Sequence, residues 1–385
     1  MIWIAWKMLT GDKSKYIGIV FGVAFASLLI SHQISIFVGI MTRSNHLLHN
    51  IREPDIWVMD PNVRYVDEVI GLSEDALYQV RGVEGVRWAV RFERATVRTR
   101  LAEGNHPKAR GDFRQVILLG LDDTTLIGAP RKMLIGSMAD LKQPDAVIID
   151  QAGYEFLWPK QPLRIGQILE MNDHRAVLVG VCDSGQPFQS QPIFFTLYSR
   201  SIDFSPPERR MLSYVLVGAN EGEDQKKLAR RIAQKTHLQA LTVEEFKWKT
   251  IRFYLATTGI PINFGITITL GVIVGIAIAG QTFYLFTLEN LRQFGALKAM
   301  GLSNSRVVGM ILVQGTIVGI VGYGIGIGLA AAFFEGTQNQ IHLKGFAMLP
   351  EIMIGTGVVV VVIVLLASLL SIRKVLVLEP AVVFR

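Results

Sequence analysis

The chain is poor in cysteine and in charge. Cys182 is its only cysteine among 385 residues, so no disulfide forms within the chain and no cysteine cluster is present to bind a metal. Charged residues make up 18% of the sequence, below the roughly 25% that is usual for soluble domains. Hydrophobic residues make up 50%. This balance indicates a membrane protein.

The sequence also lacks the motifs of common catalytic and nucleotide-binding sites. It contains no G-x-x-x-x-G-K-[ST], and "GDKS" at 11–14 has no glycine at the required upstream position. No H-E-x-x-H, G-x-S-x-G or C-x-x-C occurs, and the seven histidines are scattered without metal-ligand spacing. We therefore expect no catalytic, cofactor-binding or metal-binding residue in this chain.

Four apolar runs are long enough to cross a bilayer, which takes about 20 residues. They cover 17–40, 263–288, 307–334 and 352–372. Lysine and arginine are frequent in 1–16, 289–306 and 373–385 but scarce in 335–351. Because basic flanks stay in the cytoplasm, we predict that both termini and 289–306 are cytoplasmic. The 41–262 segment and the short 335–351 loop are then exported.

The net charge of +7 lies mostly in these flanks, where topology and anionic lipid account for it. Residues 1–16 add Trp3 and Trp6 to their lysines, which favours a helix lying on the inner leaflet. The alternative is a plain cytoplasmic start to the first membrane helix. In the exported segment, five arginines lie within 87–100 and form either an anion-binding face or a solvated one. Few aromatics accompany them, so we expect no nucleic-acid partner.

The exported segment mixes helix and strand patterns. Strand and helix patterns at its two ends flank a strand-rich middle, which predicts an α+β domain of two subdomains, one inserted into the other. In 86–101 the alternation of apolar residues changes register, which predicts a β-bulge near Glu93–Arg94. A hairpin is expected to turn at Asn172–Asp173. The segment ends in a stalk helix that runs into the second span and breaks near Pro261.

Glycine is the informative residue in the membrane runs. Gly271 and Gly275 share four-residue spacing, as do Gly315 and Gly319, and small residues at this spacing let helix backbones approach closely. The pattern fits packing within one chain and a dimer interface equally well. His32 is the one ionisable candidate inside a span, and we expect it to pack near the outer interface rather than to conduct ions.

The sequence between the second and third runs, "ENLRQFGALKAMGLSNSRV", and the ending "RKVLVLEPAVVFR" resemble the signatures of type VII ABC transporter permeases, the group of MacB, LolC/LolE and FtsX. Within that group, "PDIWVMDPNVRYVDE", "GVEGVRWAVRF" and "VILLGLDDTTLIGAP" resemble the DevC subfamily. The resemblance implies an α+β membrane protein with four transmembrane helices. A large periplasmic domain of two subdomains is inserted between the first and second.

The resemblance also implies a function. The chain is expected to be the non-catalytic permease subunit of an exporter in the bacterial inner membrane, a homodimer that binds two copies of a separate ATPase. ATP and magnesium bind to that partner, and motion of the periplasmic domains drives export of a glycolipid, peptide or hydrophobic small molecule. A periplasmic adaptor and a TolC-like outer-membrane channel are further expected partners. The alternative is an FtsX-like regulator that activates a periplasmic cell-wall enzyme without transport.

The 289–306 helix is the expected ATPase contact. Its small residues allow close approach and its charged residues offer polar contacts. The candidate residues are Glu289, Arg292, Gly295, Ala296, Lys298, Ala299 and Gly301.

Overall fold

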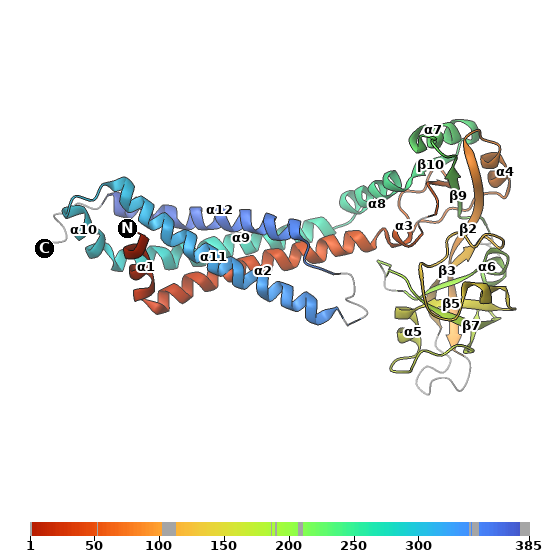
Figure 1. Cartoon of the computed structure of the whole chain (residues 1–385), viewed down its shortest axis with the longest axis horizontal. Helices are drawn as coiled ribbons and strands as arrows, with labels where there is room; N and C mark the ends of the chain where they lie inside the picture. The colour runs from red at the N-terminus through yellow and green to blue at the C-terminus, as the bar shows by residue number, and fades with distance from the viewer. Residues whose placement is uncertain are drawn as a thin grey trace. The chain divides into compact units, whose positions relative to one another are not determined.

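The computed structural model divides the chain into two compact units (Figure 1). One comprises Met1–Gly39 and Gly259–Arg385, and we call it the membrane unit; the other comprises Ile40–Thr258, and we call it the sheet unit. The structure describes residues 2–377 apart from residues 52, 102–112, 186, 189, 190, 207–210, 339 and 341–345. Residues 378–385, which make up most of the predicted tail 373–385, therefore lie outside the described residues.

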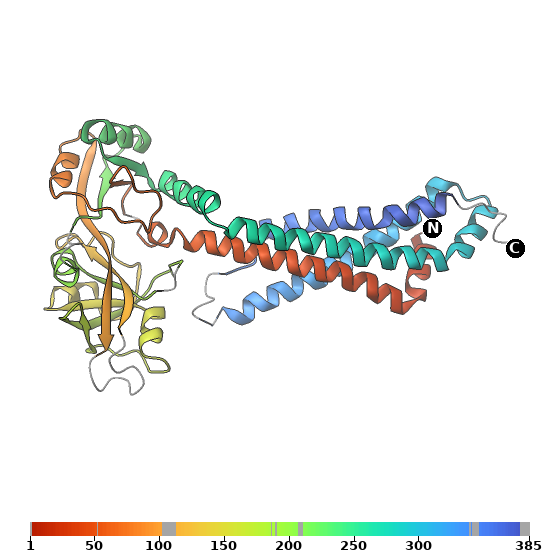
Figure 2. The ribbon, with the colours of Figure 1, turned by 180° about the vertical axis from the view of Figure 1, so that it is seen from behind.

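Four helices in the described residues are long and apolar enough to cross a membrane. They are α2 (Lys13–Arg43), α9 (Ile260–Glu289), α11 (Asn304–Thr337) and α12 (Pro350–Leu376). Figures 1 and 2 show them running side by side. Each contains one of the four apolar runs. The predicted fold class, four membrane helices with an α+β domain between the first and second, is confirmed.

Two short helices complete the membrane unit, α1 (Ile2–Gly11) and α10 (Leu291–Ala299). On α1, Ala5 and Leu9 are buried, whereas Trp3 is 69% exposed. The side-chain amide of Gln314 on α11 donates to the carbonyl of Ala5 at 3.0 Å, inside the protein. A buried amide without a partner is costly, so this bond helps to fix α1 against α11.

The sheet unit contains ten strands among the described residues, with helices around them. Its remaining elements are α3 (His46–Asn50), β1 (Ile56–Met59), α4 (Asp75–Arg81), β2 (Val86–Leu101), β3 (Arg114–Leu121), β4 (Lys132–Ile135), the 3₁₀-helix Met138–Lys142, β5 (Ala146–Asp150), α5 (Gln151–Leu157), β6 (Ile168–Met171), β7 (His174–Asp183), β8 (Ile193–Leu197), α6 (Tyr198–Phe204), β9 (Tyr214–Ala219), α7 (Gln225–Thr236), β10 (Gln239–Thr242) and α8 (Val243–Thr257).

The long strand β2 belongs to two parts of the sheet. The strand order is β10-β1-β9-β2-β3-β8-β5-β7-β4, and β6 pairs with β2 and β7. Up to Phe92, β2 pairs with β9, whereas from Glu93 onward it pairs with β3. The strands from the two ends of the segment thus form one part, and the strands between them form the other. This is the arrangement of an inserted subdomain joined through a shared strand.

The predicted bulge near Glu93–Arg94 is wrong. The register of β2 shifts between Val86 and Trp88 instead. At Glu93 the strand changes partner, so both of its faces become covered and Phe92, Glu93, Arg94 and Ala95 are all buried. The change of apolar register in the sequence therefore marks the passage of β2 from one core to another.

The core beside this passage is aromatic. Trp57 of β1 is fully buried. The centre of its ring lies 5.3 Å from the ring centre of Tyr214 of β9 and 5.8 Å from that of Phe92. Both contacts are edge-on, the geometry that aromatic quadrupoles favour. Phe246 of α8 closes the cluster at 6.1 Å from Trp57. The strands from both ends of the segment, together with the stalk helix, thus share one core.

Local chemistry sets the ends of several elements. The predicted hairpin turn is confirmed, since Asn172 and Asp173 join β6 to β7 with φ values of 45° and 68°. Two positive φ values are the mark of a type I′ turn, which asparagine and aspartate tolerate. Helix α8 begins with a capping box of Thr242 and Glu245. The next helix, α9, carries Pro261 in its first turn, where a missing N–H costs little.

Candidate coupling surface

Helix α10 connects α9 to α11, and one of its faces is buried. Phe294 is fully buried and belongs to one apolar cluster with Leu9 of α1, Phe286 of α9, Val307 of α11 and Val375 of α12. Burying a phenylalanine side chain contributes about 1.5–3 kcal/mol. Phe294 therefore anchors α10 in an apolar cluster to which these four other helices of the membrane unit also contribute.

Lys298 supplies a second attachment. Its ammonium group donates to the carbonyl of Val375 at 2.7 Å, in the last turn of α12. The final carbonyls of a helix have no partner within the helix, and a cation there interacts favourably with the helix dipole. Burial lowers the pKa of this ammonium group. Lys298 therefore faces α12, and Gly295 beside it is buried as well.

The opposite face of α10 is exposed. Arg292, Ala296 and Ala299 lie on it at spacings of four and three residues, which places them on one side of the helix. Met300 follows with 75% exposure. We call Arg292, Gln293, Ala296, Ala299 and Met300 the coupling surface. It has a charge at one end, small residues in the middle and a flexible thioether at the other end.

Glu289 and Gly301 flank the coupling surface, one before α10 and one after it. Glu289, at the end of α9, forms an ion pair with Lys15 of α2, which also pairs with Asp12 at 2.6 Å. Gly301 has φ of +93°, a conformation that side chains disfavour. Gly301 lies in the turn between the end of α10 and the start of α11. Of the seven predicted contact residues, Glu289, Arg292, Ala296, Ala299 and Gly301 are exposed, whereas Gly295 and Lys298 face inward.

The four membrane glycines pack against helices of the same chain. A Cβ at Gly275 would lie 2.6 Å from the Cβ of Ala26 on α2, and one at Gly271 would lie 3.1 Å from Leu29. On α11, Gly315 and Gly319 both face Val364 of α12. These contacts show packing within one chain, and the dimer interface that the spacing also fits stays a prediction.

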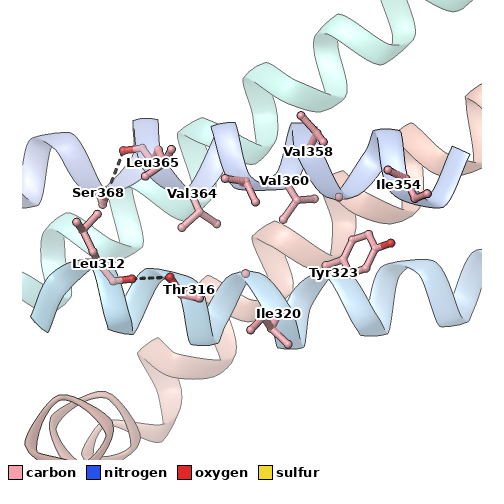
Figure 3. Close-up of a pocket in the computed structure, with 13 residues that line it drawn as sticks. Leu312, Thr316, Ile320, Tyr323, Ile354, Val358, Val360, Val364, Leu365 and Ser368 are labelled. Atoms are coloured by element: carbon pink, nitrogen blue, oxygen red, sulfur yellow. Dashed lines mark hydrogen bonds between the residues drawn. The ribbon is translucent and has the colours of Figure 1, made fainter. Parts of the chain in front are cut away.

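A hollow of about 620 Å³ lies between α11 and α12 (Figure 3). Its wall is almost wholly apolar, and its few polar groups are already hydrogen-bonded: the hydroxyl of Tyr323 donates to Met353, that of Thr316 to Leu312, and that of Ser368 to Leu365. A wall with no unmet hydrogen bond suits hydrocarbon. Its place on two membrane helices makes lipid chains the natural contact.

The structure also shows the surroundings of His32 and of the arginines in 87–100. The ring of His32 stacks on Phe334 at 5.5 Å and meets Phe333 edge-on at 5.0 Å, so it packs between helices as expected. In the arginine-rich strand, Arg91 pairs with Glu74 and Arg94 with Asp67, each at 2.9 Å, and Arg100 pairs with Glu170. Carboxylates thus neutralise three of the five arginines, which weakens the idea of an anion-binding face.

Among the described residues, no group of three or more histidine, cysteine, aspartate and glutamate side chains gathers to hold a metal. Sequence reasoning did not find the bond from Gln314 to Ala5. The signal was a single amide inside an apolar helix, a residue type that in membranes usually marks a helix contact.

Comparison with known proteins identifies the C-terminal part. Residues 265–380 match the model of the FtsX-like permease C-terminal family. The chain carries an FtsX-like permease domain. The predicted membership of the type VII ABC permease superfamily is thus confirmed, while the finer resemblance to DevC stays a prediction.

Three proteins with similar sequences are ABC transporter permeases, which agrees with this family match. An uncharacterized ABC transporter permease of Mycobacterium bovis is 31% identical over 114 residues, as are two uncharacterized ABC transporter permeases from strains of Mycobacterium tuberculosis. The match covers 29% of this chain and 31% of the mycobacterial proteins, so it spans about a third of their length.

Two solved structures resemble the chain more distantly. The extracellular domain of the noncanonic ABC-type transporter YknZ from Gram-positive bacteria is 16% identical, with a TM-score of 0.36, and the match covers 49% of this chain and 99% of that domain. The periplasmic region of MacB from Actinobacillus actinomycetemcomitans is 13% identical with a TM-score of 0.38, covering 55% and 98%. Because these scores are low, the fold of the sheet unit rests on the strand pairing described above.

Proposed function

We propose that this chain is the permease subunit of a type VII ABC exporter and that the coupling surface binds its ATPase. The observation that carries the proposal is the two-sided construction of α10. One face is fixed to the other helices through Phe294 and Lys298. The other exposes small residues that a partner can approach closely. A force applied to the exposed face therefore passes to the apolar cluster that α10 shares with α1, α9, α11 and α12.

The remaining parts of the proposal follow from the family. The chain acts as a homodimer in the inner membrane and engages two ATPase copies that hold ATP and magnesium, and it performs no catalysis itself. Both termini and α10 lie in the cytoplasm, and the sheet unit lies in the periplasm. There it works with an adaptor and an outer-membrane channel to export a glycolipid, peptide or hydrophobic small molecule.

The test is permease-stimulated ATP hydrolysis, measured with the purified chain in lipid nanodiscs and its ATPase partner. Ala299→Trp places a large ring on the coupling surface. We expect it to reduce the stimulation at least tenfold, because a tenfold loss requires only about 1.4 kcal/mol of lost contact. Arg292→Glu reverses the charge on the same face and is expected to act in the same direction.

The control is Leu349→Trp, which adds the same ring at an exposed position just before α12, 41% accessible in the wild type. It is expected to keep full stimulation. All variants must purify with unchanged thermal midpoints. Full stimulation in folded Ala299→Trp and Arg292→Glu proteins contradicts the proposal.

A further inference from the structure

The sheet unit contains a gap along one edge of β2. The ladder between β2 and β9 ends at the pair Phe92–Tyr214, and the ladder between β2 and β6 begins at the pair Thr99–Met171. On this edge, no described strand pairs with the stretch of β2 between these two points. On the other edge, the same stretch is paired continuously with β3.

The backbone of Thr96 points into this gap. The amide of Arg94 donates to the hydroxyl of Ser213 at 3.0 Å, and the carbonyl of Arg98 accepts from the amide of Asn172 at 3.0 Å. Backbone groups of alternate residues point to the same edge of a strand, so those of Thr96, between them, point there too. Its neighbour across the ladder, Ile117, likewise turns its amide away and donates to Pro192.

A cavity of about 350 Å³ opens at this point. Its lining consists of Asp67, Val69, Gly71, Arg94, Ala95, Thr96 and Met211. The side chain of Arg94 is only 9% exposed and pairs with Asp67 at 2.9 Å, yet its Nε has no hydrogen-bond partner. Nε is closed off from solvent, so the Arg94 side chain presents its ion pair with Asp67 to the cavity and no free donor.

The rim of the cavity differs from its floor. Val69 and Met211 are 39% and 46% exposed. The backbones at the rim are held by a bond from the amide of Leu72 to the carbonyl of Leu212 at 2.7 Å. Methionine adapts to varied apolar surfaces. The site thus combines a polar floor, one free strand position and an adaptable apolar mouth.

We propose that this cavity binds an extended peptide segment by strand addition to β2. The peptide's carbonyl and amide pair with the amide and carbonyl of Thr96. Backbone pairing of this kind gives affinity without demanding a particular sequence. Because Asp67 already neutralises Arg94, a terminal carboxylate gains no affinity here, and an uncharged internal segment is sufficient. The site lies outside the coupling surface, so its test needs no ATPase.

The test measures the fluorescence anisotropy of a labelled tetra-alanine, blocked at both ends, titrated with the full chain in nanodiscs. We expect saturable binding. A tetra-alanine with methylated backbone nitrogens is expected to bind at least tenfold more weakly, because it cannot donate to the carbonyl of Thr96. A tetra-alanine with a free carboxylate is expected to bind equally well. Absence of saturable binding, equal binding of the methylated peptide, or a tenfold preference for the free carboxylate overturns the proposal.

Two variants locate the site. Val69→Trp fills the mouth from an exposed position, and Thr96→Pro removes the amide that faces the gap; each is expected to weaken binding at least tenfold. Tyr78→Trp places an indole ring on α4 in exchange for a phenol, where the wild-type side chain is 59% exposed, and should leave binding unchanged. If Thr96→Pro fails to fold, Val69→Trp alone decides. Unchanged binding by folded Val69→Trp rejects the cavity as the site.

Discussion

The membrane unit and the sheet unit exclude solvent from their interiors in opposite ways. In the membrane unit the closest contacts form where side chains are missing: a Cβ at Gly326 of α11 would lie 2.5 Å from the carbonyl oxygen of Ala24 on α2. In the sheet unit the centre is filled by Trp57, Tyr214 and Phe246. Water drives large apolar groups inward, whereas lipid offers helices no such gain and leaves close packing as the main attraction.

The largest expected effect tests the aromatic half of this comparison. Trp57→Ala removes the ring at the centre of the cluster and leaves a cavity, at a cost of about 3–5 kcal/mol. Chemical denaturation of the sheet unit in the full chain measures it. The matched control is Trp248→Ala on α8, where the wild-type side chain is 53% exposed. It should change the free energy of unfolding by no more than about 0.5 kcal/mol. Similar losses in both variants would contradict this account of the core.

A second prediction concerns Glu93, a charge placed inside the sheet unit. Burial raises its pKa to about 7, although hydroxyls of Ser201 and Ser205 donate to it. The unfolded carboxyl titrates near 4.5, so between these values the folded protein binds more protons. The free energy of unfolding therefore falls as the pH rises from about 4.5 to 7, by about 3 kcal/mol at most.

Glu93→Gln removes this titration. The difference in unfolding free energy between wild type and variant should change across that pH window and stay level above it. Thermal melts of the full chain at a series of pH values provide the measurement. A difference that does not vary with pH would show that the carboxyl titrates normally in the folded protein.

For the membrane unit, two glycine-to-alanine substitutions in α11 are expected to change stability in opposite directions. Gly326→Ala forces the backbones of α2 and α11 apart, and overpacking of this kind costs about 1–3 kcal/mol. Gly328→Ala, where a Cβ meets nothing within 4 Å, should instead stabilise α11 by up to about 1 kcal/mol, because alanine favours a helix. Thermal midpoints in nanodiscs compare the two. Equal shifts of the same sign would remove the role assigned to close approach.

The smallest effect is expected at the end of α12. Lys298→Met keeps most of the side chain but removes the bond to Val375, at a cost of about 1 kcal/mol. Hydrogen exchange in the last turn of α12 should increase, while Arg292→Met, on the exposed face of α10, should leave it unchanged. An unchanged exchange rate in the Lys298 variant would show that water replaces the ammonium group there without loss.

Much of the architecture could be predicted from the sequence, because its signals are local. The membrane runs follow from length and apolarity, and the turn at Asn172–Asp173 follows from residues that tolerate positive φ. The passage of β2 between two cores was misread as a bulge. A local change of register does not reveal which distant strand lies beside it.

For the candidate site, the sequence by itself determined that a helix of small and charged residues lies between the second and third membrane runs, although α10 covers only Leu291–Ala299 of the predicted 289–306. Only the tertiary structure decided which face remains free. Lys298 and Arg292 are equivalent as charges in a sequence, but one caps α12 and the other is exposed. The same holds for the gap beside Thr96, since an unpaired strand edge exists only when strands distant in sequence have taken their places. Spacing fixes the face of a helix or strand, and the partners of that face come from the rest of the chain.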